Sequence, residues 1–227
     1  MWQKVNPVGM RVGTMKSWPS EWYAKSKRMG SDFFVEDIQI RNFVDKAFPR
    51  AGISKVIVRK TQKEGEIILF ASKVGALMGK NWEKIKSVEQ QLKDKFHKDF
   101  KINVKEVRVP ELSARIMAEY IATQIEWRMP YRKVVKQTIS KIMEKGADGV
   151  KVQIGWRLNW ADIARSEHFI EWRVSLQTFR SDIDYYYLQA MTKYGVLGIK
   201  VRIQKGTQYN AKKKTKKDVM SMVTNQD

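Results

Sequence analysis

The chain has 227 residues, of which 43% are hydrophobic, so it can form one large domain or two small ones. It contains no cysteine, which excludes disulfides and thiolate metal sites, and no apolar run approaches the roughly 20 residues that span a bilayer. Its 44 Lys and Arg residues against 24 Asp and Glu residues give a formal net charge of +20. The lack of cysteine and of an apolar span leads us to expect a cytoplasmic protein. The charge predicts a polyanionic partner, because such an excess repels itself in a folded chain.

Nucleic acid is the favoured partner, since each phosphate that a basic side chain neutralises releases counterions. An anionic membrane is less suitable, because the basic residues are spread along the chain and not gathered on one amphipathic helix. A charge that serves only solubility is the remaining alternative.

Residues 1–30 are expected to form a basic arm whose order depends on a partner. The arm has six basic residues and one acidic residue, and prolines and glycines interrupt it without a clear period. Trp18, Trp22 and Tyr23 make it more apolar than a purely solvated tail.

Residues 31–109 follow as a compact α+β domain. Apolar residues at helical spacing predict two helices, and β-rich runs predict three strands, with a turn at residues 63–65. The expected order is helix, strand, strand, loop and helix, strand, at residues 32–48, 53–59, 66–72, 85–96 and 101–109.

Residues 110–206 are predicted to form a second α+β domain, with two helices on a mostly antiparallel sheet. Pro130 separates a helix over 111–126 from a second that Gly146 ends. Strands are expected at 150–154, 173–185 and 195–204, and a further helix within 160–170. The remaining residues, 207–227, are a lysine-rich tail that we expect to be disordered alone.

No pattern in the chain indicates an enzyme. His97 and His168 lack metal-ligand spacing, and there is no glycine-rich loop of the kind that holds a nucleoside triphosphate. Asp182 and Asp184 share one predicted strand face, so a metal-dependent nuclease is an alternative, but a structural ion pair is favoured. We expect no catalytic residues, no metal and no cofactor.

The basic residues of the second domain are better organised. On the helix after Pro130, three cations are predicted to lie opposite the apolar face, as a helix that grips a phosphate backbone requires: Arg132, Lys133 and Lys136. An ordinary solvated helix face is the alternative. Further arginines recur along this domain, and their guanidinium groups match phosphate geometry: Arg157, Arg165, Arg173 and Arg180.

These segments, in this order, resemble the bacterial small-subunit ribosomal protein three (the S-three family) over nearly the whole chain. The similar segments are QKVNPVGMRVG, SWPSEWYA, PEL, RKVVK, IARSE, RVSLQTFR, DIDY and YGVLGIKV. The resemblance implies a type II KH domain at residues 31–109 and no catalytic site.

The same resemblance implies partners and RNA-binding residues. The partners would be 16S rRNA in the head of the small subunit, incoming mRNA, and the neighbouring ribosomal proteins ten and fourteen. The KH loop would be Gly79, Lys80, Asn81 and Trp82, and the cluster at the mRNA entry would be Arg132, Lys133 and Lys136. Contacts with rRNA are expected from Lys4, Arg11, Arg157, Arg165, Arg173 and Arg180. The alternative is a free-standing KH-type RNA-binding or RNA-chaperone protein that acts off the ribosome.

Five tryptophans stand where the family has glycine: Trp2, Trp82, Trp156, Trp160 and Trp172. Tryptophan can adopt positive φ angles or allow close backbone approach only at a cost. We hypothesise that these positions are UGA codons read as glycine in the source cell, since one base change converts GGA into UGA. A genuine substitution, with Trp82 as a platform for base stacking, is the alternative.

Overall fold

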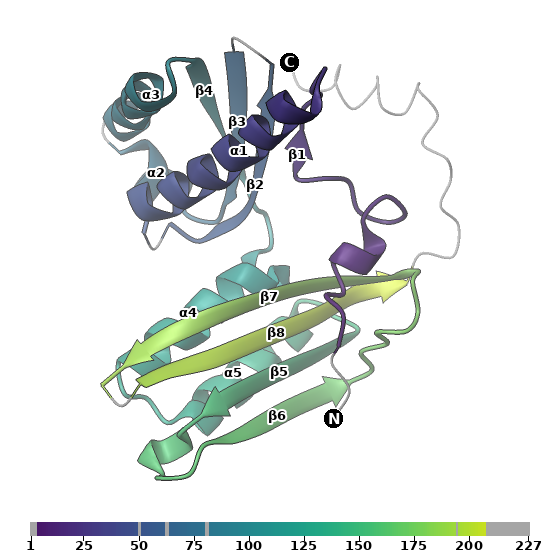
Figure 1. The fold of residues 1–227 in the computed structure, drawn as a ribbon. Coiled ribbons are helices and arrows are strands. Elements are labelled where there is room, and N and C mark those ends of the chain that lie inside the picture. The colour runs from purple at the N-terminus through teal and green to yellow at the C-terminus, as the bar shows by residue number, and fades with distance from the viewer. Residues whose placement is uncertain (1–3, 50, 62–63, 80–81, 194, 208–227) are drawn as a thin grey trace.

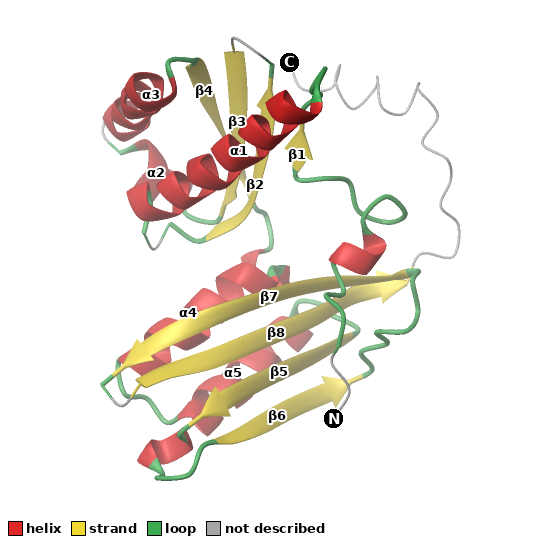
Figure 2. Ribbon diagram, in the orientation of Figure 1, coloured by secondary structure: helices red, strands yellow, loops and turns green. Residues whose placement is uncertain are grey.

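The computed structural model describes residues 4–49, 51–61, 64–79, 82–193 and 195–207, without the side chain of Trp160. The chain forms two four-stranded sheets, and each sheet has helices packed on one face (Figures 1 and 2). In the described part of the chain, no helix is long and apolar enough to cross a membrane. The α+β fold expected from the sequence is confirmed.

The first sheet has the strand order β1-β2-β3-β4, with β2 antiparallel to β3 and the other two pairs parallel. Its core consists of apolar residues from the strands and helices, among them Ile40, Val58, Leu69 and Leu92. The elements are α1 (Lys27–Ala47), β2 (Ile53–Lys60), β3 (Glu64–Ala71), α2 (Val74–Met78), α3 (Glu83–Phe96) and β4 (Asp99–Glu106), preceded by the short β1 (Ser20–Glu21).

The predicted elements of this half are all present, with shifted ends. Helix α1 begins five residues before the expected 32, because Ser26 accepts a hydrogen bond from the Met29 backbone N–H and caps the first turn. The turn expected at 63–65 is wrong for its last two residues, because Glu64 and Gly65 belong to β3 and pair with β4. Residue 63 lies outside the described residues. Strand β1 and the short helix α2 were not predicted.

The second sheet has the order β6-β5-β8-β7, and every pair is antiparallel. Alternate residues of its central strands, such as Val152, Ile154 and Val201, are fully buried against α4 and α5, while no α-helix of the described residues packs on the opposite face (Figure 1). The elements are α4 (Ala114–Glu126), α5 (Tyr131–Glu144), β5 (Gly149–Trp156), β6 (Arg165–Trp172), β7 (Ser181–Thr192) and β8 (Gly195–Thr207).

Two predictions for this half are wrong. The helix expected within 160–170 is absent, because the chain makes only a 3₁₀ turn at Leu158–Trp160 and then pairs as the edge strand β6. The strand expected to begin at 173 begins at Ser181, after an irregular loop. The predicted tail falls almost entirely on residues 208–227, which lie outside the described residues.

The two halves meet through polar contacts near the start of α4. The hydroxyl groups of Ser54 on β2 and Ser113 lie 2.8 Å apart, and Arg115 Nη2 donates to Asp45 Oδ1 at 2.6 Å. Helix α1 of the first half is thereby tied to α4 of the second. The first and second halves of the chain are thus joined by hydrogen bonds and an ion pair as well as by the backbone.

The arm at the start of the chain differs from the prediction, because the described residues from 4 onward pack on the protein itself. Arg11 is 0% exposed and donates to the backbone oxygens of Ser181, Pro7, Leu176 and Thr178. Lys16 donates to the Ile183 oxygen at 2.6 Å. The segment crosses the helix-free side of the second sheet before it joins β1 (Figure 1). Its order therefore comes from intramolecular contacts.

Candidate RNA-binding surfaces

The loop between α2 and α3 is the first candidate site. Gly79 ends α2 with a φ of +65°, and its N–H donates to the Gly75 oxygen at 3.1 Å. Trp82 follows at the N-cap of α3, with φ +62° and ψ +13° and an exposed indole. Lys80 and Asn81 lie outside the described residues. Both ends of the loop thus have positive φ angles, and the second end is the positively polarised start of a 14-residue helix.

Helix α5 is the second candidate, and its two faces lie as predicted. Tyr131, Val134 and Ile142 are buried, whereas the cations Arg132, Lys133 and Lys136 are exposed. An exposed basic helix that stands on an apolar core can contact a phosphate backbone without rearranging the fold.

Glu167 on β6 connects α5 to Arg165, which the sequence analysis had placed among the rRNA-binding residues and not in the cluster at the mRNA entry. Its carboxylate accepts hydrogen bonds from the Tyr131 hydroxyl at 2.9 Å, from Arg132 Nη2 at 3.3 Å and from Arg165 Nε at 3.0 Å. The hydrogen bond from Tyr131, followed by those from the two arginines, lowers the pKa of Glu167 despite the opposing effect of burial. Arg132 and Arg165 are therefore positioned side by side at one edge of the sheet.

Glu167 itself was not singled out from the sequence. Its segment was predicted to be a helix, and in a helix two residues that are two positions apart, such as Arg165 and Glu167, do not face each other. In a strand, residues two apart lie on the same face, which is how Arg165 and Glu167 meet.

The remaining predicted rRNA-binding residues are dispersed, and one has a different role. Lys4, Arg157, Arg173 and Arg180 are exposed around the second half of the molecule. Arg11, by contrast, is buried and its guanidinium donates to four carbonyl oxygens, so it serves as an internal anchor and is not presented to RNA. That prediction is corrected.

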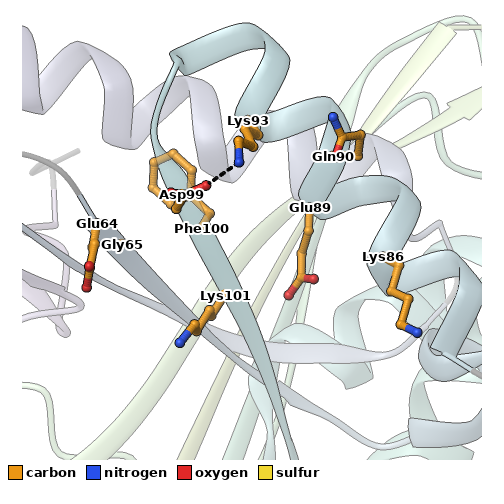
Figure 3. Close-up of a pocket in the computed structure, with 9 residues that line it drawn as sticks. All are labelled: Glu64, Gly65, Lys86, Glu89, Gln90, Lys93, Asp99, Phe100 and Lys101. Carbon is orange, nitrogen blue, oxygen red and sulfur yellow. Dashed lines mark ion pairs between the residues drawn. The ribbon is translucent and has the colours of Figure 1, made fainter.

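A pocket lies between α3 and the β3–β4 edge (Figure 3). Its charged residues have both signs, and Lys93 is paired with Asp99 at 2.8 Å across one side. Glu89 accepts a hydrogen bond from the Ile102 backbone N–H at 2.7 Å, which ties α3 to β4. These contacts hold α3 on the sheet. Because acidic and basic side chains both line the pocket, it does not attract a polyanion such as RNA. Its lining is Glu64, Gly65, Lys86, Glu89, Gln90, Lys93, Asp99, Phe100 and Lys101.

The two aspartates considered as a metal pair are both held by basic residues. Asp182 lies 3.4 Å from Lys16 Nζ, and Asp184 lies 3.6 Å from Lys205 Nζ and also accepts a hydrogen bond from the Ala114 backbone N–H at 3.1 Å. In the described part of the chain, no group of three or more His, Asp or Glu side chains could hold a metal ion. These aspartates fix the arm and α4 in place.

Two family models match the chain, one for each half. Residues 39–112 match the KH domain, and residues 121–203 match the C-terminal domain of ribosomal protein S3. The small ribosomal subunit protein uS3 of Persephonella marina is 42% identical over 207 residues, which is 91% of this chain and 91% of that protein. The uS3 protein of Clostridium tetani is 42% identical over 221 residues, 96% of this chain and 99% of that protein. The chain belongs to the uS3 family.

Membership in the uS3 family confirms the resemblance read from the sequence motifs. The KH match runs from within α1 through the loop at Gly79 to the 3₁₀ turn at Pro110–Leu112. The match to the uS3 C-terminal domain covers α5, the strands β5, β6 and β7 and most of β8, including Glu167 and Arg165. Both candidate sites thus lie within the matched regions.

Proposed function

We propose that the chain is a structural constituent of the head of the small ribosomal subunit, where it binds 16S rRNA beside ribosomal proteins ten and fourteen. It also helps to form the mRNA entry channel and grips incoming mRNA. The observation that carries this proposal is the exposed cationic face of α5, aligned with Arg165 through Glu167, in a chain of the uS3 family.

The gripping role requires charge and position but no bond-making group. Phosphate contacts fix a nucleic acid in place without reading its sequence, as a channel for every message requires. Arg132 is held by Tyr131 and Glu167, so its guanidinium loses little freedom when a phosphate binds. Lys133 and Lys136 add exposed charge on the same helix.

Contacts with rRNA are assigned to exposed cations elsewhere. The KH loop, at Gly79 and Trp82, contacts one segment of the rRNA through its backbone. The arginines of the second half contact another segment of the rRNA. Those arginines, with the lysine of the arm, are Lys4, Arg157, Arg165, Arg173 and Arg180.

The paired substitution Arg132→Ala with Lys133→Ala tests the role in mRNA handling. We expect ribosomes that carry this variant to move through a structured message about threefold more slowly, because two phosphate contacts at the entry are lost. Subunit assembly should survive, since both side chains are exposed and Glu167 keeps its bonds to Tyr131 and Arg165. The measurement is the rate of translation through a stable hairpin.

A matched control removes two exposed lysines of the first half of the chain, Lys46→Ala with Lys105→Ala. This control should translate the hairpin at the wild-type rate. Equal rates for the two double variants would contradict the role assigned to α5.

A further inference from the structure

The helix-free face of the second sheet carries cations and aromatic rings in register. Cross-strand pairing places Lys151 beside Arg202 and Arg202 beside Tyr185. In the next row, Gln153, Lys200 and Tyr187 lie side by side. Two carboxylates of these outer strands stay out of the rows, because Glu167 and Asp184 point to the helix side, toward α5 and the start of α4.

Arg202 has a conformation that is costly without a ligand. It is only 5% exposed, and among the described residues its Nε and Nη1 atoms are buried with no hydrogen-bond partner. Its guanidinium lies 5.2 Å from the centre of the Tyr185 ring, which supports the cation but satisfies no N–H. A buried guanidinium with unmet donors destabilises the folded protein unless an anion binds it.

The charges around Arg202 have the same sign. Burial, followed by the neighbouring cations Lys4 and Arg202, lowers the pKa of Lys151. Lys200 lies 5.8 Å from the centre of the Tyr187 ring in the adjacent row. Like charges gathered this closely repel one another, and a phosphate group placed among them removes that repulsion.

We propose that this face is a binding site for single-stranded RNA. One backbone phosphate is held by Lys4, Lys151 and Arg202, a second lies at Lys200, and a base stacks on the exposed ring of Tyr187. Aromatic rings interleaved with cations are the arrangement that single-stranded nucleic acid requires. This site rests on the proposed RNA-binding function and gives it a location that neither α5 nor the KH loop provides.

The test uses the full chain and a fluorescently labelled single-stranded RNA of mixed sequence. We expect Lys151→Gln with Lys200→Gln to weaken binding about tenfold and to reduce the salt dependence of log K by about 1.4, which is 0.7 for each lost phosphate contact. The control, Lys46→Gln with Lys145→Gln, removes the same charge elsewhere and should change affinity much less. Thermal unfolding verifies that both variants fold.

The outcomes separate this site from the proposed function. If the wild-type chain does not bind RNA, the proposed function fails. If it binds RNA and the two double variants bind it equally, only the sheet-face site is overturned. If Lys151→Gln with Lys200→Gln weakens binding to poly-glutamate but not to RNA, the face recognises an acidic protein and the RNA assignment is overturned.

A second, independent observation concerns the tryptophans. Trp82 has φ +62°, Trp172 has φ +57° and Trp156 has φ +134°. The first two φ angles lie in the left-handed region, which strains a residue that has a side chain, and the third lies in a region essentially confined to glycine. All three indoles are exposed, so burial does not compensate for the strain.

These are three of the five tryptophans that the sequence placed at glycine positions. Trp2 lies outside the described residues, and the side chain of Trp160 is not described. Trp127, which was not among the five, has an ordinary φ of −79°. Trp22 is partly buried and packs edge-on against Phe33, as a tryptophan with a structural role would.

We infer that positions 82, 156 and 172 are glycine positions of this fold and that the protein made in its own cell carries glycine there. Glycine at 82 would give the loop glycines at 79 and 82, the spacing with which a KH loop clamps an RNA backbone. It would also remove the indole from the place where that backbone must approach.

Two measurements test this inference. Peptide mass spectrometry of the protein from its source cell should find glycine at all three positions; tryptophan there would overturn the inference. In the recombinant chain, Trp82→Gly, Trp156→Gly and Trp172→Gly together should raise Tm by about 5 °C. The control Trp127→Gly, at an equally exposed site with negative φ, should lower Tm or leave it unchanged. A larger loss of Tm in the triple variant than in the control would contradict the inference.

Discussion

Replacement of Arg11 by methionine is expected to lower the free energy of unfolding by about 3–5 kcal/mol. The guanidinium is fully buried, and its Nε, Nη1 and Nη2 atoms donate to four backbone oxygens at distances from 2.7 to 3.1 Å. Methionine fills similar space but leaves those oxygens without a donor. The arm would then detach from the loop that precedes β7.

Urea denaturation measures this loss, and limited proteolysis reports whether the arm is released. Arg11→Lys serves as the control, because it keeps the charge but cannot reach all four oxygens, so its loss should be intermediate. A methionine variant within 1 kcal/mol of the wild type, with an arm that still resists proteolysis, would show that Arg11 is not the anchor.

Ile121→Ala is expected to lower the free energy of unfolding by about 2–5 kcal/mol, because it removes atoms from a fully buried position and leaves a cavity. Ile121 lies on α4 in the core between the helices and the second sheet and is 0% exposed. Ile163→Ala makes the same chemical change at a residue that is 81% exposed, and should shift stability by no more than about 0.5 kcal/mol. Similar losses in the two variants would contradict the assignment of this core.

The sequence predicted the helices and most strands because apolar spacing follows burial on one face. Val134 and Ile142 recur on one side of α5, and that alone placed Arg132, Lys133 and Lys136 outside. Strand β6 was misread because it is an edge strand with His168 and Ile170 exposed and Glu167 turned toward the helices, so no clear alternation of apolar and polar residues marks it.

Contacts distant in sequence account for what the sequence could not predict. Arg11 was expected to face RNA, yet its acceptors at Leu176, Thr178 and Ser181 come from more than 160 residues away. The alignment of Arg132 with Arg165 through Glu167 likewise depends on how β6 lies against α5. The positive φ angles of Trp82, Trp156 and Trp172, in contrast, occur at positions where the resemblance to the family had already indicated glycine.

Sedimentation of the tagged chain from its source cell, in a sucrose gradient at high salt, tests the central claim most directly. A constituent of the small subunit is held by many buried contacts as well as by charge, so it should remain with the small-subunit peak when salt screens its exposed cations. Release of the chain to the top of the gradient as salt rises, with the subunit itself intact, would contradict the account and favour a free-standing RNA-binding protein.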